Sequence, residues 1–171
     1  RYEGYGPGGV AVLVEAFTDN RNRTAADLRL VFSKAGGNLG ESGCVSFLFD
    51  QRSVVRIEQP DLQEEALLER ALDLEEGGGP PVLSYSLDGE GADVIGRFEE
   101  LEALQGGLRR LGLPVRSWEH RWLANTLCRV EDPELLRAVV RMLDALEELE
   151  DVRSVTANLE AEEALLEAVV V

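Results

Sequence analysis

The sequence predicts an α+β fold in which a ferredoxin-like plait is interrupted by a second ferredoxin-like unit. A strand, helix, strand pattern occupies residues 10–49 and recurs at 123–158, and a similar run fills residues 54–120 between them. Two split β-α-β halves around an insert are the order of elements that an interrupted plait would have. The expected domains are a discontinuous ferredoxin-like domain of residues 1–53 and 122–160, an inserted α/β domain of residues 54–121, and a tail of residues 161–171.

The first half of the interrupted unit opens with a loop rich in turn-forming residues. Tyr2–Gly9 contains four glycines and a proline, a composition typical of turns. Val10–Phe17 is apolar and β-branched, which predicts a buried strand. The polar residues 18–22 offer N-caps for a helix over Arg23–Ala35, and Gly36 with Gly37 would end that helix. After a loop, a strand over Cys44–Asp50 would place its apolar residues on one face.

The insert contains its own strands and helices. A short turn at residues 51–53 leads to a strand over Val54–Glu58. The elements that follow are a helix from Asp61 to about Glu75, a strand over Val82–Leu87, a mostly helical segment over Asp93–Leu111 and a strand over Pro114–His120.

The closing half begins with a strand over Leu123–Val130. Asp132 followed by Pro133 is an N-cap with proline at the first helical position, so a helix is expected to about Glu150. Val152–Asn158 is the last predicted strand, and residues 159–171 fit either a short helix or a poorly ordered tail. The two helices of this unit would cover one face of its sheet and leave the other face open for a partner.

The net charge of −16 is distributed unevenly. Residues 1–59 hold seven basic and seven acidic side chains, whereas residues 60–171 hold ten basic and 26 acidic ones. Binding of phosphate backbones depends on Lys and Arg. We therefore expect contact with nucleic acid from the N-terminal third, or from sequence upstream of Arg1, because the chain begins without an initiator methionine.

Several classes of protein are disfavoured by composition. The longest apolar run, Val10–Val14, falls far short of the roughly 18 residues of a membrane helix, so we expect a cytoplasmic protein with no membrane partner. Two distant cysteines, Cys44 and Cys128, do not make a disulfide-stapled domain. One histidine and one lysine supply no metal site and no nucleophile with its base. The sequence therefore predicts neither an enzyme nor a cofactor.

Two arginines stand where helix stability does not call for them. Arg21 and Arg23 lie at a helix start, where the macrodipole disfavours cations. Together with the free amides of that helix end they could hold a phosphate. The alternative is that they pair with Asp19, Asp27 or a backbone carbonyl.

The glycine-rich opening has two interpretations. It does not match a phosphate-binding loop, because its glycines precede a strand rather than a helix. It is either a structural turn or a backbone loop that meets a partner, flanked by Tyr2 and Tyr5.

Several blocks of sequence resemble one known family. They are Tyr2–Val12 (YEGYGPGGVAV), Thr18–Thr24 (TDNRNRT), Phe32–Lys34 (FSK), Gly36–Gly40 (GGNLG) and Gly43–Phe49 (GCVSFLF), with weaker matches at Leu143–Glu147 and Asp151–Val155. In these blocks the chain is similar to the YebC family, which includes bacterial transcriptional regulators and mitochondrial translational activators. The middle departs from the family pattern: Glu90–Leu111 is longer, and Gly77–Pro81 replaces part of an expected hairpin.

The resemblance implies three domains, of which the first, a basic helical bundle, would lie upstream of Arg1. It also implies binding to nucleic acid, either DNA or the ribosomal RNA of the ribosome. That binding would occur mainly through the upstream domain. Our leading hypothesis is a non-enzymatic regulator of gene expression. Rivals are a protein-interaction module that never touches nucleic acid, and a small-molecule sensor. The expected contact surface consists of Tyr2, Tyr5, Gly6, Gly8, Gly9, Asp19, Asn20, Arg21, Asn22, Arg23, Thr24 and Lys34.

Overall fold

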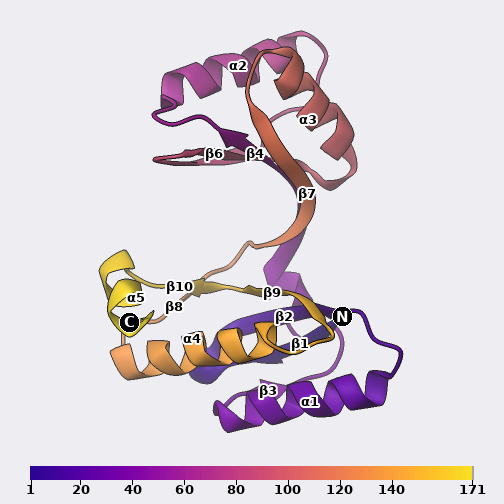
Figure 1. Cartoon of the computed structure of the whole chain (residues 1–171), viewed down its shortest axis with the longest axis vertical. Helices are drawn as coiled ribbons and strands as arrows, with labels where there is room; N and C mark the ends of the chain where they lie inside the picture. The colour runs from indigo at the N-terminus through magenta and orange to yellow at the C-terminus, as the bar shows by residue number, and fades with distance from the viewer. Residues whose placement is uncertain (171) are drawn as a thin grey trace. The chain divides into compact units, whose positions relative to one another are not determined.

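The computed structural model describes residues 1–170 and divides into two α+β units (Figure 1). The first unit combines residues 1–50 with the chain from 123 onward, and the second spans Gln51–Trp122. The insert was expected over residues 54–121, and residues 161–170, expected as a tail, belong to the first unit. Residue 171, the end of the expected tail, lies outside the described residues.

The first unit is built on a four-stranded sheet in the order β3-β1-β2-β9. Its strands are β1 (Tyr2–Tyr5), β2 (Ala11–Ala16), β3 (Asn38–Leu39) and β9 (Val152–Ala157), each antiparallel to its neighbour. A short 3-10 turn, Pro7–Gly9, joins β1 to β2.

The prediction of a loop over residues 2–5 is wrong. Tyr2 pairs with Val14 and Tyr5 with Ala11, so this segment is a strand. Position 4 of this strand is a glycine because α1 packs closely on it. A Cβ there would lie 2.8 Å from Cε1 of Phe32.

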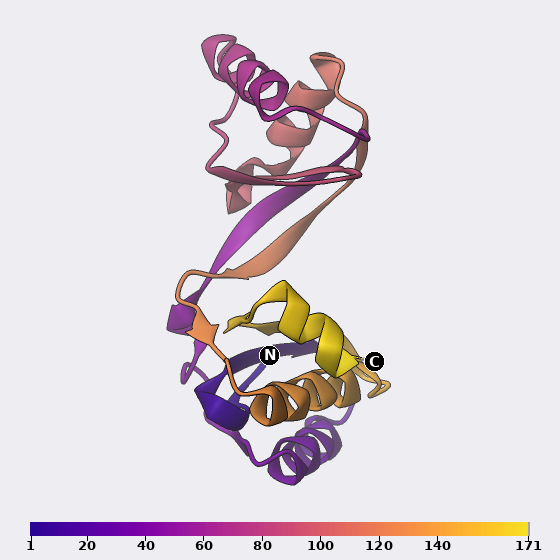
Figure 2. The same ribbon diagram turned by 90° about the vertical axis from the view of Figure 1, so that its left-hand side faces the viewer.

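Two helices cover one face of this sheet, as predicted (Figures 1 and 2). They are α1 (Arg21–Lys34) and α4 (Pro133–Glu147), whose Asp132 cap accepts a hydrogen bond from the N–H of Glu134. Their shared core consists of Val10, Val12, Val14, Leu28, Phe32, Val130, Leu136, Val139, Met142, Leu146 and Val169.

The end of the chain joins the first unit rather than leaving it. Of the two alternatives for residues 159–170, the helix is correct: α5 (Glu163–Val170) packs on α4 and buries Val169. Just before α5, β10 (Leu159–Glu160) pairs in parallel with β8 (Cys128–Arg129), outside the four-stranded sheet. The prediction of one strand over Leu123–Val130 is therefore wrong. Leu123 and Ala124 end β7, and only Cys128 and Arg129 form a strand of this unit, outside its four-stranded sheet.

The second face of the sheet is not open at Leu13 and Glu3, contrary to expectation. Leu13 is fully buried, and Glu3, its partner on β1, is 1% exposed. The Glu3 carboxylate accepts hydrogen bonds from the backbone N–H groups of Gly43 (2.7 Å), Val45 (3.0 Å) and Ser46 (2.7 Å). Because these donors are used by a side chain, Cys44–Asp50 is not the predicted strand: a 3-10 turn, Ser46–Leu48, precedes β4. Both cysteines are free thiols.

The second unit has the element order strand, helix, strand, strand, helix, strand. The elements are β4 (Phe49–Glu58), α2 (Glu64–Glu76), β5 (Ser84–Asp88), β6 (Gly91–Arg97), α3 (Leu101–Arg110) and β7 (Val115–Ala124). The strand order is β5-β6-β4-β7, so β7 is an edge strand. The core lies between the sheet and both helices and includes Val55, Ile57, Leu67, Leu74, Ala92, Val94, Leu104 and Leu108.

Three predictions fail in this unit. Asp93–Leu111 is helical only from Leu101, because Gly91–Arg97 pairs on both sides, with β4 and β5. The turn at 51–53 is absent, since Arg52 and Ser53 continue β4 and pair with β6. A single strand, β7, also runs through the break expected after His120. No helix in the described part of the chain is long and apolar enough to cross a membrane.

Candidate nucleic-acid interface

The turn between β2 and α1 holds most of the predicted polar residues. The hydroxyl oxygen of Thr18 accepts a hydrogen bond from the N–H of Asn20 at 3.0 Å. Asn20 Oδ1 in turn accepts one from the N–H of Arg23 at 3.1 Å, which makes Asn20 the N-cap. The helix therefore begins at Arg21, two residues before the predicted start.

Arg23 is engaged in the fold. Its Nη2 lies 3.1 Å from Oδ2 of Asp151, and the hydroxyl of Thr24 donates to the same oxygen at 3.0 Å. The hydrogen bond from Arg23, together with that from Thr24, holds the pKa of the Asp151 carboxyl below its usual value. Asp151 precedes β9, so this pair fastens the start of α1 to the start of that strand. Arg23 also pairs with Asp19 at 3.6 Å, as the ion-pair alternative expected, but its shorter contact, with Asp151, was not among the expected partners.

Arg21 is differently placed. Its side chain lines an open hollow of about 500 Å³, and among the described residues it forms no ion pair. The hydroxyl of Tyr2 donates to the backbone oxygen of Arg21 at 3.4 Å. The other residues that line the hollow are Arg1, Tyr2, Ala16, Phe17, Thr18, Asn22 and Ala25.

An exposed aromatic ring stands beside this hollow. Phe17 is 69% exposed, and the guanidinium carbon of Arg153 lies 4.4 Å from its ring centroid, a cation–π contact. In the sequence, Phe17 falls at the end of a predicted buried strand, and no motif marks Arg1 or Arg153 as a contact residue. A large apolar residue directly before a polar turn was the only local signal. Arg153 reaches the ring only because β9 pairs with β2.

The glycine loop packs against α4. A Cβ on Gly6 would lie 2.6 Å from Cε of Met142, and one on Gly8 would lie 2.7 Å from Cδ2 of Leu135. The missing side chains therefore let α4 approach the loop. Tyr5, at the far end of β1 from Tyr2, donates its hydroxyl to the backbone oxygen of Cys44 at 3.3 Å.

Lys34 lies at the opposite end of α1 from Arg21, about 20 Å away along a 14-residue helix. It borders a groove of about 410 Å³ between α1 and α4, together with Val31, Ala35, Ala138, Arg141, Met142 and Ala145. The structure thus brings together Tyr2, Arg21 and Asn22, and it places Tyr5, the glycine loop and Lys34 elsewhere.

The fold and this surface define a two-unit α+β protein with an exposed aromatic ring among arginines. The chain belongs to the TACO1/YebC family: the model of that family's second and third domain matches residues 1–159.

Known relatives agree with this membership. The chain is 55% identical over 166 residues to a "probable transcriptional regulatory protein" of Synechococcus sp. (strain CC9902), covering 96% of this chain and 64% of the relative. It is 52% identical over 167 residues to a protein of the same description from Gloeothece citriformis (strain PCC 7424), covering 97% and 64%. The crystal structure of a conserved hypothetical protein from Aquifex aeolicus superposes with a TM-score of 0.83 at 41% identity, covering 95% of this chain and 64% of that one. The chain thus spans 64% of the length of these relatives.

Proposed function

We propose that this chain acts in a non-enzymatic, cytoplasmic regulator of gene expression that docks on nucleic acid. Its contact surface, here the Phe17 surface, would consist of Arg1, Tyr2, Phe17, Arg21, Asn22 and Arg153. The relatives' description as transcriptional regulators supports the regulatory part. The exposed Phe17 ring, held by Arg153 next to a hollow lined by two further arginines, carries the binding part.

The chemistry of this surface suits unpaired bases. An aromatic face stacks on a base, while neighbouring arginines contact the phosphates on either side. Bases of a duplex are already stacked, so an isolated exposed phenylalanine favours single-stranded segments such as loops of ribosomal RNA over duplex DNA. Because the chain carries a net charge of −16, a basic region outside it would supply most of the phosphate contacts of the full-length protein.

We also propose a ferredoxin-like assignment for the second unit. The second unit follows the β-α-β-β-α-β order with strands β5-β6-β4-β7, which supports the assignment directly. The first unit differs in connectivity, because two consecutive strands, β1 and β2, precede its first helix, and β1 lies between β3 and β2 in the sheet.

A salt titration of RNA binding tests the proposed surface. The full-length protein would be compared with its F17A and R21A variants, using a fluorescent single-stranded RNA and a duplex DNA of equal length. F17A should weaken RNA binding roughly tenfold through lost stacking, and R21A should lower the salt slope by about one. R29A is the matched control, because Arg29 is exposed on the same helix away from the hollow. Equal effects of R29A and R21A, or no effect of F17A, would reject the surface.

The groove between α1 and α4 favours a second candidate, a protein-interaction module. Its lining is mainly apolar, with Lys34 and Arg141 as cations, which suits an acidic amphipathic helix. Substitution A138W would fill the groove. Loss of a protein partner, with RNA binding intact, would support this candidate over the first.

A further inference from the structure

The second unit carries a separate basic and aromatic surface. In an acidic chain, residues 103–122 contain four arginines and a single acidic residue, Glu119. They form most of α3 and the edge strand β7, where residues 116–121 are all exposed. We name this the β7 surface; it consists of Phe98, Arg109, Arg110, Arg116, Trp118 and His120.

Two aromatic rings on this surface are each held by a second group. The guanidinium carbon of Arg109 lies 4.7 Å from the centroid of the Trp118 ring, and Trp118 is 36% exposed. Phe98, also 36% exposed, stacks on His120 with 4.0 Å between centroids and 26° between planes. His120 Nε2 lies 2.8 Å from the backbone oxygen of Phe98, which holds the imidazole in place. Both rings are therefore exposed and fixed in orientation.

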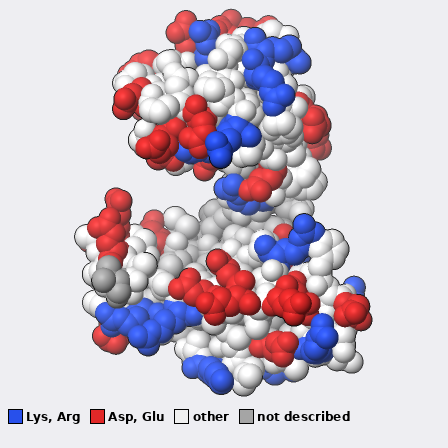
Figure 3. Space-filling view, viewed as in Figure 1, with Lys and Arg blue, Asp and Glu red and all other residues white. Residues whose placement is uncertain are grey.

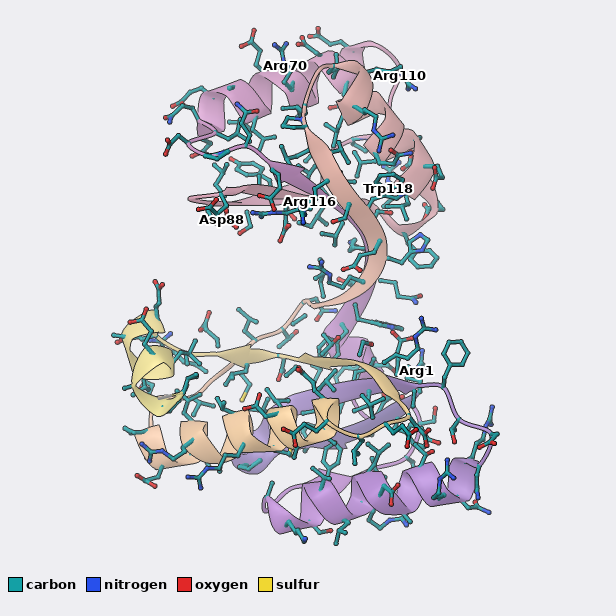
Figure 4. The ribbon with its side chains drawn as sticks, viewed as in Figure 1. Arg1, Arg70, Asp88, Arg110, Arg116 and Trp118 are labelled. Carbon is teal, nitrogen blue, oxygen red and sulfur yellow. The ribbon has the colours of Figure 1, made fainter. Side chains whose placement is uncertain are left out.

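The arginines of the β7 surface, on α3 and β7, are largely available. Arg109 and Arg110 form no ion pair with any described residue. The Arg116 side chain is 71% exposed, and among the described residues its one ion pair is with Glu58 at 4.0 Å. Arg97 and Arg121 differ, since Glu100 and Glu119 pair with them. Figure 4 shows Arg110 on α3 with Arg116 and Trp118 on β7, and Figure 3 shows Lys and Arg atoms gathered over α3.

Charged residues on an edge strand have another common purpose. They prevent a second chain from adding to the sheet. That purpose requires charge but gains nothing from exposed tryptophan and phenylalanine rings, which would themselves favour association. The combination of exposed rings with arginines that have few carboxylate partners points instead to a ligand that presents both flat bases and phosphates.

We propose that the β7 surface is a second binding site, for single-stranded nucleic acid. Trp118 and Phe98 stack on bases, and Arg109, Arg110 and Arg116 contact the phosphates. This inference goes beyond the Phe17 surface, since it lies on the other unit and shares no residue with it. It stands even where the Phe17 surface has no role.

Intrinsic fluorescence tests this site directly. Trp118 and Trp122 are the only tryptophans, so the W122F variant leaves Trp118 as the sole reporter. The probe is an oligouridine of twelve nucleotides, which is titrated into the whole chain at low salt. Stacking should quench Trp118 along a saturating curve. In the wild-type background, W118A should weaken binding of the labelled probe roughly tenfold, and R110A should reduce the salt slope by about one.

Matched variants separate this site from its alternatives. R70A makes the same charge change on α2 of the same unit, where Arg70 pairs with Asp73, and it should leave binding unchanged. F17A with R21A should leave Trp118 quenching intact, so failure of the Phe17 surface and failure of the β7 surface give different results.

The W118F variant retains an aromatic ring. Its near-wild-type binding would show that the loss of binding in W118A reflects stacking rather than unfolding. Unquenched Trp118 at saturating probe, equal effects of R70A and R110A, or capture by β7 of a peptide strand without RNA would each overturn the proposal.

Discussion

The buried carboxylate of Glu3 accepts a hydrogen bond from the backbone N–H of Val45 at 3.0 Å, in a region where Val45 is itself fully buried. Two more backbone donors and Arg1 complete the surroundings of this carboxylate. A single side chain therefore determines the path of residues 43–46. Glu3→Gln should destabilise the chain by about 2–4 kcal/mol, because an amide oxygen accepts these hydrogen bonds less strongly and its NH₂ faces other donors. Denaturant unfolding measures the change. A loss of less than about 0.5 kcal/mol in the free energy of unfolding would show that residues 43–46 keep their conformation without Glu3.

The same residue should make stability depend on pH. Burial acts to raise the pKa of Glu3, but the hydrogen bonds from Gly43, Val45 and Ser46 outweigh it, and the pKa lies below its ordinary value. The unfolded chain therefore takes up the proton first as the pH falls. The contribution is complete above the ordinary carboxyl pKa and is lost as the pH falls through the lower folded value. Unfolding curves of wild type and E3Q should be well separated at neutral pH and converge in acid; a constant gap would contradict this.

Arg21 and Arg23 should behave differently when replaced, although they are two residues apart. R23A breaks the contact with Asp151 and should cost up to about 1 kcal/mol, since Arg23 is half exposed and solvent screens the pair. R21A should change stability by less than about 0.5 kcal/mol. A double-mutant cycle of R23A with D151A isolates the pair. Zero coupling would mean that Arg23 is as free as Arg21.

Two glycines provide a test of close packing. A Cβ on Gly37 would overlap the backbone oxygen of Tyr5, which cannot move without shifting β1. Gly37→Ala should therefore destabilise the first unit by about 1–3 kcal/mol. Gly89→Ala, where nothing lies within 4 Å, should be neutral or slightly stabilising. Thermal unfolding of the two variants makes the comparison, and equal melting temperatures would contradict the predicted contact.

The sequence by itself determined the elements whose signals are local. The apolar run before Phe17, the Asp132–Pro133 cap and the helical stripes of α1 and α4 each depend on neighbours within a few residues. The apolar stripe that each of these helices buries and the position of Arg21 at a helix start are local in the same sense.

The tertiary structure alone decided the elements and contacts that depend on distant residues. In the sequence Gly4 indicates a turn, whereas in the fold Phe32 packs against it inside a strand. The sequence predicts a strand over Cys44–Asp50, but Glu3 accepts hydrogen bonds from the backbone N–H groups of Val45 and Ser46. The contacts of Phe17 with Arg153 and of Arg109 with Trp118 likewise required the fold. Strand pairing and helix packing bring such residues together, and neither is encoded in the spacing of residues along one segment. The identity of an aromatic residue in a sequence does not reveal whether its ring is exposed or buried. Only the folded chain therefore distinguishes a binding surface from the core of the protein.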